Sequence, residues 1–165
     1  MIQISYTVAT NKTAEKVFNF FRSLHKHYLR LSKGHKKFEI SNAHALAKGV
    51  CINNEETVFG QTVTHMYQVI DFIENRCIKM VSPRSTATIL KILKIPLKVT
   101  VEFTLESSTQ NKTSVSSCVT LEFKNKFSEL FARLLNTKRI WKSHLKEELE
   151  NGLKIIESQP VDGIF

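Results

Sequence analysis

Residues 125–158 read NKFSELFARLLNTKRIWKSHLKEELENGLKIIES, and this stretch decides the fold. Its apolar residues recur every three or four positions, at Phe127, Leu130, Phe131, Leu134, Leu135, Trp141, Leu145, Leu149, Leu153 and Ile156. This spacing, with charged residues between, predicts a long amphipathic helix. Asn125 is placed to cap it, whereas Asn136 and Gly152 are the weakest positions, at which the helix can kink or break. Such a helix needs a broad apolar partner surface.

Alternating apolar and polar residues upstream predict a sheet that supplies this surface. The alternating segments are residues 2–8, 36–40, 50–52, 63–70, 78–81, 99–105 and 115–123. A turn or a bulge is expected at Asn53-Asn54, and the hairpin turn Glu74-Asn75 argues for antiparallel pairing. After the first strand, apolar residues at helical spacing predict a helix, with Val17, Phe20, Phe21 and Leu24 on one face. A second short helix is predicted from about His25 to Ser32, and it should bury Tyr28, Leu29 and Leu31 in part. The predicted class is α+β.

Length and composition predict one globular domain over residues 1–158, followed by a loose tail over 159–165. No apolar run approaches the roughly 18 residues of a membrane span, and the first residues alternate like a strand rather than a signal peptide. The three cysteines are widely spaced, as expected for reduced thiols. A cytoplasmic location is therefore predicted.

The formal net charge of +9 is the one unusual bulk property. Residues 22–37 carry six Lys and Arg and three His without an acid, and residues 84–98 are also free of acids. Such patches suit phosphate, an anionic lipid surface or an acidic ligand, although a solvated surface is the commoner explanation. Nucleic-acid binding is not expected, because only Tyr28 and Phe38 interleave aromatic rings with the first patch.

Three features resemble the START-like helix-grip superfamily (SRPBCC), which includes polyketide cyclases and ubiquinone-binding proteins. Residues 11–18 read NKTAEKVF after the first strand, where that family has Asn-Ala-Pro-x-x-x-Val and an aromatic residue. Thr113 precedes the last strand, where the family often has Gly-x-Thr, and residues 141–145 read WKSHL within a long helix. Thr13 replaces the family's proline. The resemblance implies a curved seven-stranded antiparallel sheet around the long helix, with a cavity for an apolar ligand between them.

No metal or cofactor is predicted from residue spacing. His25, His27 and His35 do not match a zinc-type spacing such as H-E-x-x-H. The chain has no G-x-S-x-G and no glycine-rich phosphate loop, and it holds only five glycines. Covalent catalysis and nucleotide binding are therefore not expected.

Acid–base candidates are better placed. His65 and Tyr67 share one face of a strand, which either points into the cavity or away from it. His144 lies four residues before Glu148 on the long helix, so the carboxylate can orient the imidazole as a general base. The favoured alternative places this pair at the wet margin of the helix. The pair His65 and Tyr67 and the pair His144 and Glu148 both stay candidates for acid–base chemistry.

The leading functional hypothesis is binding, with transport as an optional extension, of an apolar or amphipathic small molecule or lipid in a cavity between sheet and helix. A small cyclase-type or dehydratase-type enzyme using His65, Tyr67 or His144 for proton transfer is the alternative, and a scaffold with a filled core is a third. The oligomeric state stays open. The predicted ligand contacts are Phe21, Tyr28, Tyr67, Phe103, Phe131, Leu134, Trp141 and Leu145.

Residues 85–97, STATILKILKIPL, are longer than a hairpin connection requires. The favoured interpretation is a lid, or an extension of the following strand, buried against the long helix. The alternative is a helical flap that touches an anionic membrane, with Leu90 and Leu93 entering the interface and Lys91 and Lys94 meeting headgroups.

Overall fold

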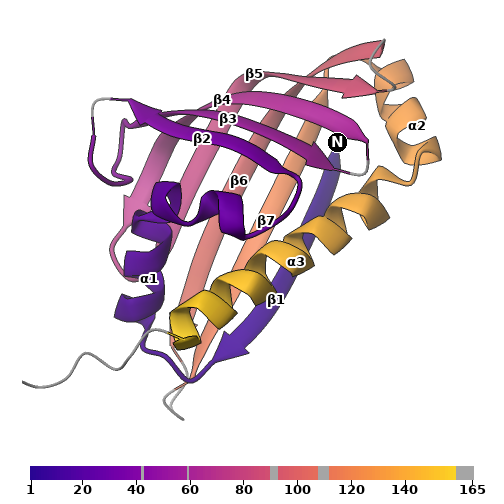
Figure 1. Ribbon diagram of the computed structural model, residues 1–165. Coiled ribbons are helices and arrows are strands. Elements are labelled where there is room, and N and C mark those ends of the chain that lie inside the picture. The colour runs from indigo at the N-terminus through magenta and orange to yellow at the C-terminus, as the bar shows by residue number, and fades with distance from the viewer. Residues whose placement is uncertain (42, 59, 90–92, 108–111, 159–165) are drawn as a thin grey trace, which may run out of the picture.

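A computed structural model describes residues 1–41, 43–58, 60–89, 93–107 and 112–158. Seven strands form one antiparallel sheet in the order β1-β7-β6-β5-β4-β3-β2 (Figure 1). Their bounds are β1 Ile2–Thr10, β2 His35–Ser41, β3 Cys51–Val58, β4 Gln61–Ile73, β5 Cys77–Ile89, β6 Leu93–Ser107 and β7 Thr113–Phe123. Strands that follow one another from β2 to β7 are neighbours, and β1 lies beside β7. The α+β class and the antiparallel sheet are confirmed.

The curved sheet faces the C-terminal helix α3, which crosses its concave side (Figure 1). The stretch predicted as one helix is two, α2 Lys126–Leu134 and α3 Thr137–Ser158. The break falls at Asn136, whose φ of 55° lies in the left-handed region that asparagine tolerates. None of the helices in the described residues is long and apolar enough to cross a bilayer. The predicted tail, 159–165, lies outside the described residues.

The helix α1, Ala14–Arg22, covers the end of the sheet after β1. The Thr13 hydroxyl caps it by accepting a hydrogen bond from the Lys16 backbone N–H, at 3.3 Å. Two short 3₁₀ helices follow, Leu24–Lys26 and Tyr28–Arg30, in place of the single helix predicted there. Tyr28 and Leu31 are buried as predicted, but Leu29 is 58% exposed because it lies on the outer side of its turn.

Two predicted connections are strand instead. Asn53 and Asn54, predicted as a turn or bulge, belong to β3, where Asn53 is exposed and Asn54 buried. The described parts of the segment 85–97, residues 85–89 and 93–97, extend the β5–β6 pairing, from Ser85↔Leu97 to Ile89↔Leu93. The helical flap is therefore wrong for the described part of this segment. Of the two forms of the favoured interpretation, a lid or a strand extension buried against the long helix, the described residues show the strand extension. Ala87 and Ile95 of this extension line the same interior pocket as Ala132 of α2 and Trp141 of α3.

Candidate functional site

The interior between the sheet and α3 holds a cluster of buried ionisable side chains centred on Glu56 of β3, which is 4% exposed. Its Oε1 lies 3.1 Å from His65 Nε2 on β4. Its Oε2 lies 3.0 Å from His144 Nε2 on α3 and accepts a hydrogen bond from the Tyr28 hydroxyl at 3.3 Å. A buried carboxylate requires such partners, since an unpaired buried charge is costly. Three separate elements therefore converge on one carboxylate.

A second carboxylate, Glu148, joins the cluster through His35. His35 Nε2 lies 2.8 Å from Glu148 Oε1 and 3.4 Å from His144 Nε2. On the other side of the ring, Nδ1 lies 2.6 Å from the backbone carbonyl oxygen of Tyr28, to which it donates. The His35 and Tyr28 rings are stacked, with centroids 3.7 Å apart. These contacts hold the His35 imidazole in one orientation.

Strand register explains how residues distant in sequence meet here. His35 is directly opposite Glu56 in the β2–β3 pairing, and Asn54 is directly opposite His65 in the β3–β4 pairing. Asn54 and Glu56 are two residues apart, so they share the inner face of β3. A Cβ at Gly34 would lie 2.2 Å from a carbonyl oxygen of β3, so only glycine permits the close approach that begins β2.

Two serines of β5 anchor His65 from behind. His65 Nδ1 lies 2.8 Å from Ser85 Oγ, and the Ser85 hydroxyl donates to Ser82 Oγ at 2.8 Å. Residues three apart in a regular strand face opposite sides, but the β5–β6 register shifts between Ser82 and Ser85, and both serines are buried. The irregularity therefore turns both hydroxyls toward the cluster.

In this cluster, burial disfavours the charged forms of the side chains, whereas pairing with an opposite charge favours them. Burial alone raises the pKa of Glu56, but hydrogen bonds from His144 and His65 outweigh it and hold that pKa well below its usual range. Burial alone lowers the pKa of His144, yet the carboxylates of Glu148 and Glu56 raise it to about 9. The pKa of His35 is likewise raised, because Glu148 overcomes the effect of burial. Near neutral pH the interior therefore holds a His144 imidazolium paired with the carboxylates of Glu56 and Glu148.

An interior pocket of about 40 Å³ adjoins the cluster. Its wall combines apolar and aromatic side chains with a few polar ones. The lining residues are Leu24, Tyr28, Phe38, Asn54, Glu56, Tyr67, Met80, Val101, Phe103, Val119, Trp141, Leu145 and Glu148. Asn54 is 3% exposed, and its Oδ1 has no hydrogen-bond partner among the described residues. The pocket therefore presents an unused buried acceptor beside an apolar wall.

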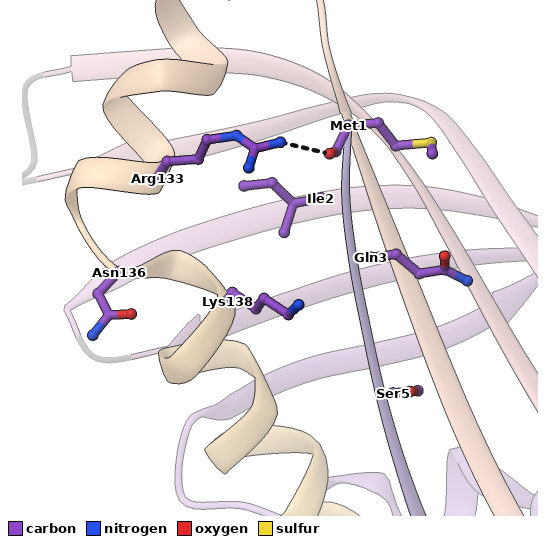
Figure 2. A pocket seen from close by; sticks show the side chains of 7 residues that line it. All are labelled: Met1, Ile2, Gln3, Ser5, Arg133, Asn136 and Lys138. Carbon is purple, nitrogen blue, oxygen red and sulfur yellow. Dashed lines mark hydrogen bonds between the residues drawn. The ribbon is translucent and has the colours of Figure 1, made fainter.

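A larger hollow lies elsewhere, on the outer surface beside β1 and the α2–α3 junction, with a volume of about 660 Å³ (Figure 2). Its lining residues are Met1, Ile2, Gln3, Ser5, Arg133, Asn136 and Lys138, of which only Ile2 is buried. Arg133 donates to the Met1 carbonyl oxygen at 3.2 Å across it. Because no buried polar groups converge there among the described residues, the candidate site is the interior cluster.

Most of the predicted ligand contacts meet in the interior. Tyr28, Tyr67, Phe103, Trp141 and Leu145 line the pocket beside the cluster. Phe21 lies behind them, stacked on the Phe103 ring with centroids 4.7 Å apart.

Two predicted contacts on α2 lie elsewhere. The prediction that Leu134 lines the cavity is wrong, because the break at Asn136 turns α2 aside and leaves Leu134 75% exposed. Phe131 is half-buried against the core but lines neither interior pocket.

The structure resolves the orientation of the acid–base candidates. His65 and Tyr67 are 0% and 4% exposed, whereas Met66 between them is 72% exposed, so the His65 face points inward. His144 is 4% exposed, which overturns the interpretation that placed it at the wet margin of the helix. The side chain of Glu148 is 17% exposed and reaches from the cluster toward that margin.

Sequence reasoning missed Glu56 and Asn54 and assigned His35 to a basic surface patch. The signal for the first two was the alternation of Ile52, Asn54, Glu56 and Val58 along one strand face. Spacing along the chain excluded a zinc motif, but the fold gathers four metal-ligating side chains from three elements. One ligand atom from each of His35, Glu56, His144 and Glu148 lies within 4.8 Å of the others.

Two of the four proposed membrane-contact residues, Leu90 and Lys91, lie outside the described residues. Leu93 begins β6, and Lys94 is exposed on that strand.

Comparison with known proteins supports the fold. No protein-family profile and no curated protein sequence matches the chain. An aromatase/cyclase from Streptomyces sp. R1128 superposes with a TM-score of 0.70 at 13% identity, covering 99% of each chain. Truncated norcoclaurine synthase from Thalictrum flavum gives a TM-score of 0.67 at 12% identity, covering 96% of this chain and 94% of that one.

A START superfamily protein from Mycobacterium smegmatis gives a TM-score of 0.61 at 16% identity, covering 93% of this chain and 98% of that one. The chain therefore has the helix-grip fold of START-like (SRPBCC) proteins, as the sequence resemblance implied. At these identities the likeness concerns the fold alone, and a fold does not by itself specify a function.

Proposed function

We propose that the protein binds a small amphipathic molecule between the sheet and α3. The apolar part of this molecule lies against Phe103 and Trp141, and its polar group meets Asn54 and Glu56. The observation that carries the proposal is the composition of the interior pocket, whose lining combines apolar and aromatic side chains with buried hydrogen-bonding groups. Ligand sites in proteins commonly have this composition, an apolar lining with a few convergent polar groups.

The polar groups of the pocket define the ligand's chemistry. Asn54 Oδ1 is a buried acceptor without a hydrogen-bond partner in the described part of the chain, and the neighbouring Glu56 and Glu148 are carboxylates that accept but do not donate. A ligand with a hydrogen-bond donor, such as a hydroxyl or ammonium group, satisfies these acceptors. A ligand ending in a carboxylate or phosphate is disfavoured, because it would bring a like charge beside Glu56.

The pocket must widen to admit such a ligand. Its volume of about 40 Å³ exceeds the roughly 30 Å³ share of one water molecule, whereas small-molecule sites span about 300–1,000 Å³. Side chains at the helix–sheet interface, such as Phe103 and Trp141, are placed to move aside. Binding therefore couples to rearrangement of aromatic side chains, and Trp141 emission reports on it.

The test is a titration of the purified chain with a neutral apolar fluorophore bearing a hydroxyl group. Saturable binding with micromolar affinity and a shift or quenching of Trp141 emission are expected. An interior that takes up no probe, measured by both fluorophore and tryptophan emission, would contradict the proposal.

A small enzyme of the cyclase or dehydratase type is a second candidate. The observation in its favour is that His144 and His65 contact the two oxygens of the same Glu56 carboxylate beside the pocket. Such a chain of donors and acceptors is able to move a proton to or from a bound molecule. Binding without turnover remains the first proposal, because the paired carboxylates and imidazoles also satisfy one another without a substrate.

Peripheral contact with an anionic membrane is a further part of the proposal, at the end of the molecule where α2 meets the β5–β6 hairpin (Figure 1). Phe127, Leu130 and Leu134 of α2 are 78%, 56% and 75% exposed, and Lys126 and Lys138 are exposed near them in sequence. Replacing Leu130 and Leu134 with Ser should reduce co-sedimentation with anionic vesicles. Leu29→Ser, a change of another exposed leucine, is the control.

A cytoplasmic location is also proposed. Cys51, Cys77 and Cys118 are all free thiols, the state expected in a reducing compartment.

A further inference from the structure

We propose that His35, Glu56, His144 and Glu148 form a binding site for one divalent metal ion of the zinc class. The ligand atoms are His35 Nε2, Glu56 Oε2, His144 Nε2 and Glu148 Oε1, contributed by β2, β3 and α3. All four lie within 4.8 Å of one another in the interior. This site goes beyond the ligand pocket, because it requires no organic molecule.

The spacing of these atoms suits tetrahedral coordination. An ion bound at about 2.1 Å from each of four nitrogen or oxygen atoms separates them by roughly 3.4 Å. His35 Nε2 lies 3.4 Å from His144 Nε2, 3.8 Å from Glu56 Oε2 and 2.8 Å from Glu148 Oε1. His144 Nε2 lies 3.0 Å from Glu56 Oε2 and 3.7 Å from Glu148 Oε1. These separations bracket the tetrahedral value, so only small side-chain shifts are needed.

Surrounding groups orient the ligands as they do in metalloproteins. His35 Nδ1 donates to the Tyr28 carbonyl oxygen at 2.6 Å, which leaves Nε2 directed at the cluster. The Glu56 oxygen that is not one of the four proposed ligand atoms, Oε1, contacts His65 Nε2 at 3.1 Å. His65 is itself held by Ser85. The carboxylate and the imidazole are therefore fixed before any ion arrives.

The charge of the four side chains, the type of their ligand atoms and the route of access also agree with binding of a zinc-class ion. Two carboxylates balance the charge of a divalent cation, and two imidazoles with two carboxylates suit Zn²⁺ and its first-row neighbours better than Ca²⁺. His35 and His144 are buried, whereas the Glu148 side chain is 17% exposed and also lines the pocket. Glu148 is the residue through which an ion enters. Displacement of Glu148 would open a coordination position toward the pocket.

The experiment uses the full chain in a Cys51→Ser background, because Cys51 is an exposed thiol that would bind zinc on its own. The chelator-treated protein is titrated with Zn²⁺ by calorimetry, and with Co²⁺ to record the visible absorption of tetrahedral coordination. One Zn²⁺ per chain, tetrahedral Co²⁺ bands and a zinc-dependent rise in Tm are expected. Glu148→Gln and His144→Gln should each weaken zinc binding by about 100-fold or more, since even outer-shell changes commonly cost 10–100-fold.

Glu147→Gln is the matched control, because it removes the same charge from the exposed neighbour of Glu148 and should leave zinc affinity unchanged. Near-UV circular dichroism verifies that each variant is folded; if His144→Gln is not, the partly exposed Glu148 decides the outcome. Absence of stoichiometric binding by folded wild type, or equal weakening by Glu147→Gln and Glu148→Gln, would overturn the proposal and leave internal ion pairs only. Fluorophore binding by the pocket is scored separately, so the two proposals fail independently.

Discussion

His144 Nε2 lies 3.0 Å from Glu56 Oε2, and this contact joins the middle of the C-terminal helix to the inner face of β3. Both residues are 4% exposed, so the contact is shielded from water and survives only with its partners in place. The contact links the two layers of the fold at the point where the pocket begins. It makes the polar cluster part of both the stability and the candidate site of the protein.

Replacing Glu56 with Gln should destabilise the protein by roughly 3–5 kcal/mol, because the change removes the shared carboxylate and leaves buried imidazoles without their partner. Urea denaturation followed by circular dichroism measures the loss. Glu55→Gln is the control, since Glu55 is the adjacent residue on the outer face of β3 and should cost less than about 0.5 kcal/mol. Equal effects of the two changes would show that the cluster contributes no special stability.

Asn54→Leu should separate ligand binding from stability. Since Asn54 Oδ1 is buried and no described residue bonds to it, replacing the amide by an apolar side chain should change the free energy of unfolding by no more than about 1 kcal/mol. Affinity for the hydroxyl-bearing fluorophore should fall at least about tenfold, equivalent to 1.4 kcal/mol. Asn53→Leu, on the exposed face, should alter neither. Unchanged affinity in Asn54→Leu would remove Asn54 from the site.

His65→Ala and His144→Ala distinguish a binding protein from an enzyme. We expect both to change ligand affinity or stability, with no product formed by any variant or by the wild type. Liquid chromatography–mass spectrometry of the molecule recovered after incubation is the measurement. Turnover by the wild type that either substitution abolishes, with affinity kept within a few-fold, would instead establish the enzymatic alternative.

His27 should make the protein less stable in mild acid. Its ring stacks on Phe20, and its Nδ1 is buried without a hydrogen-bond partner among the described residues. Burial and then the charges of Arg30, Lys26 and His25 lower its pKa below the ordinary value of about 6.5. The unfolded chain therefore binds the proton more readily than the folded protein. The contribution of His27 to stability is fully present above about pH 6.5 and is lost as the pH falls from there toward the pKa of His27 in the folded protein.

The pH dependence of the urea midpoint in wild type and His27→Gln, together with an NMR titration of the ring, measures this effect. His27→Gln should show a smaller loss of stability between neutral pH and mild acid. A His27 pKa above its ordinary value would contradict the account of its surroundings.

The sheet and the C-terminal helices were predictable from sequence because their signals are local. Alternation along Val99 to Leu105 and the helical spacing before and after Trp141 each depend on neighbouring residues only. The break at Asn136 coincides with a position recognised as weak. Asn53 and Asn54 were misjudged because asparagine favours turns, whereas pairing with β2 and β4 overrides that preference.

The cluster was not predictable, because it depends on contacts between residues far apart in the chain. His35 and His144 are 109 residues apart, and Glu56 and His144 are 88 apart. Their meeting depends on strand register and on the rotation of α3, which a single sequence does not reveal. Periodicity placed His144 near the margin of its helix; only the tertiary structure shows that β2 and β3 cover it.

The central claim is that the interior is a ligand site, and native mass spectrometry of the purified chain tests it most directly. The wild type, released gently from its expression host or after exposure to extracted lipids, should carry one additional small molecule bearing a donor group. Asn54→Leu should lose it while Asn53→Leu retains it. A wild type that stays at its bare polypeptide mass under these conditions, and also binds no fluorophore, would contradict the account.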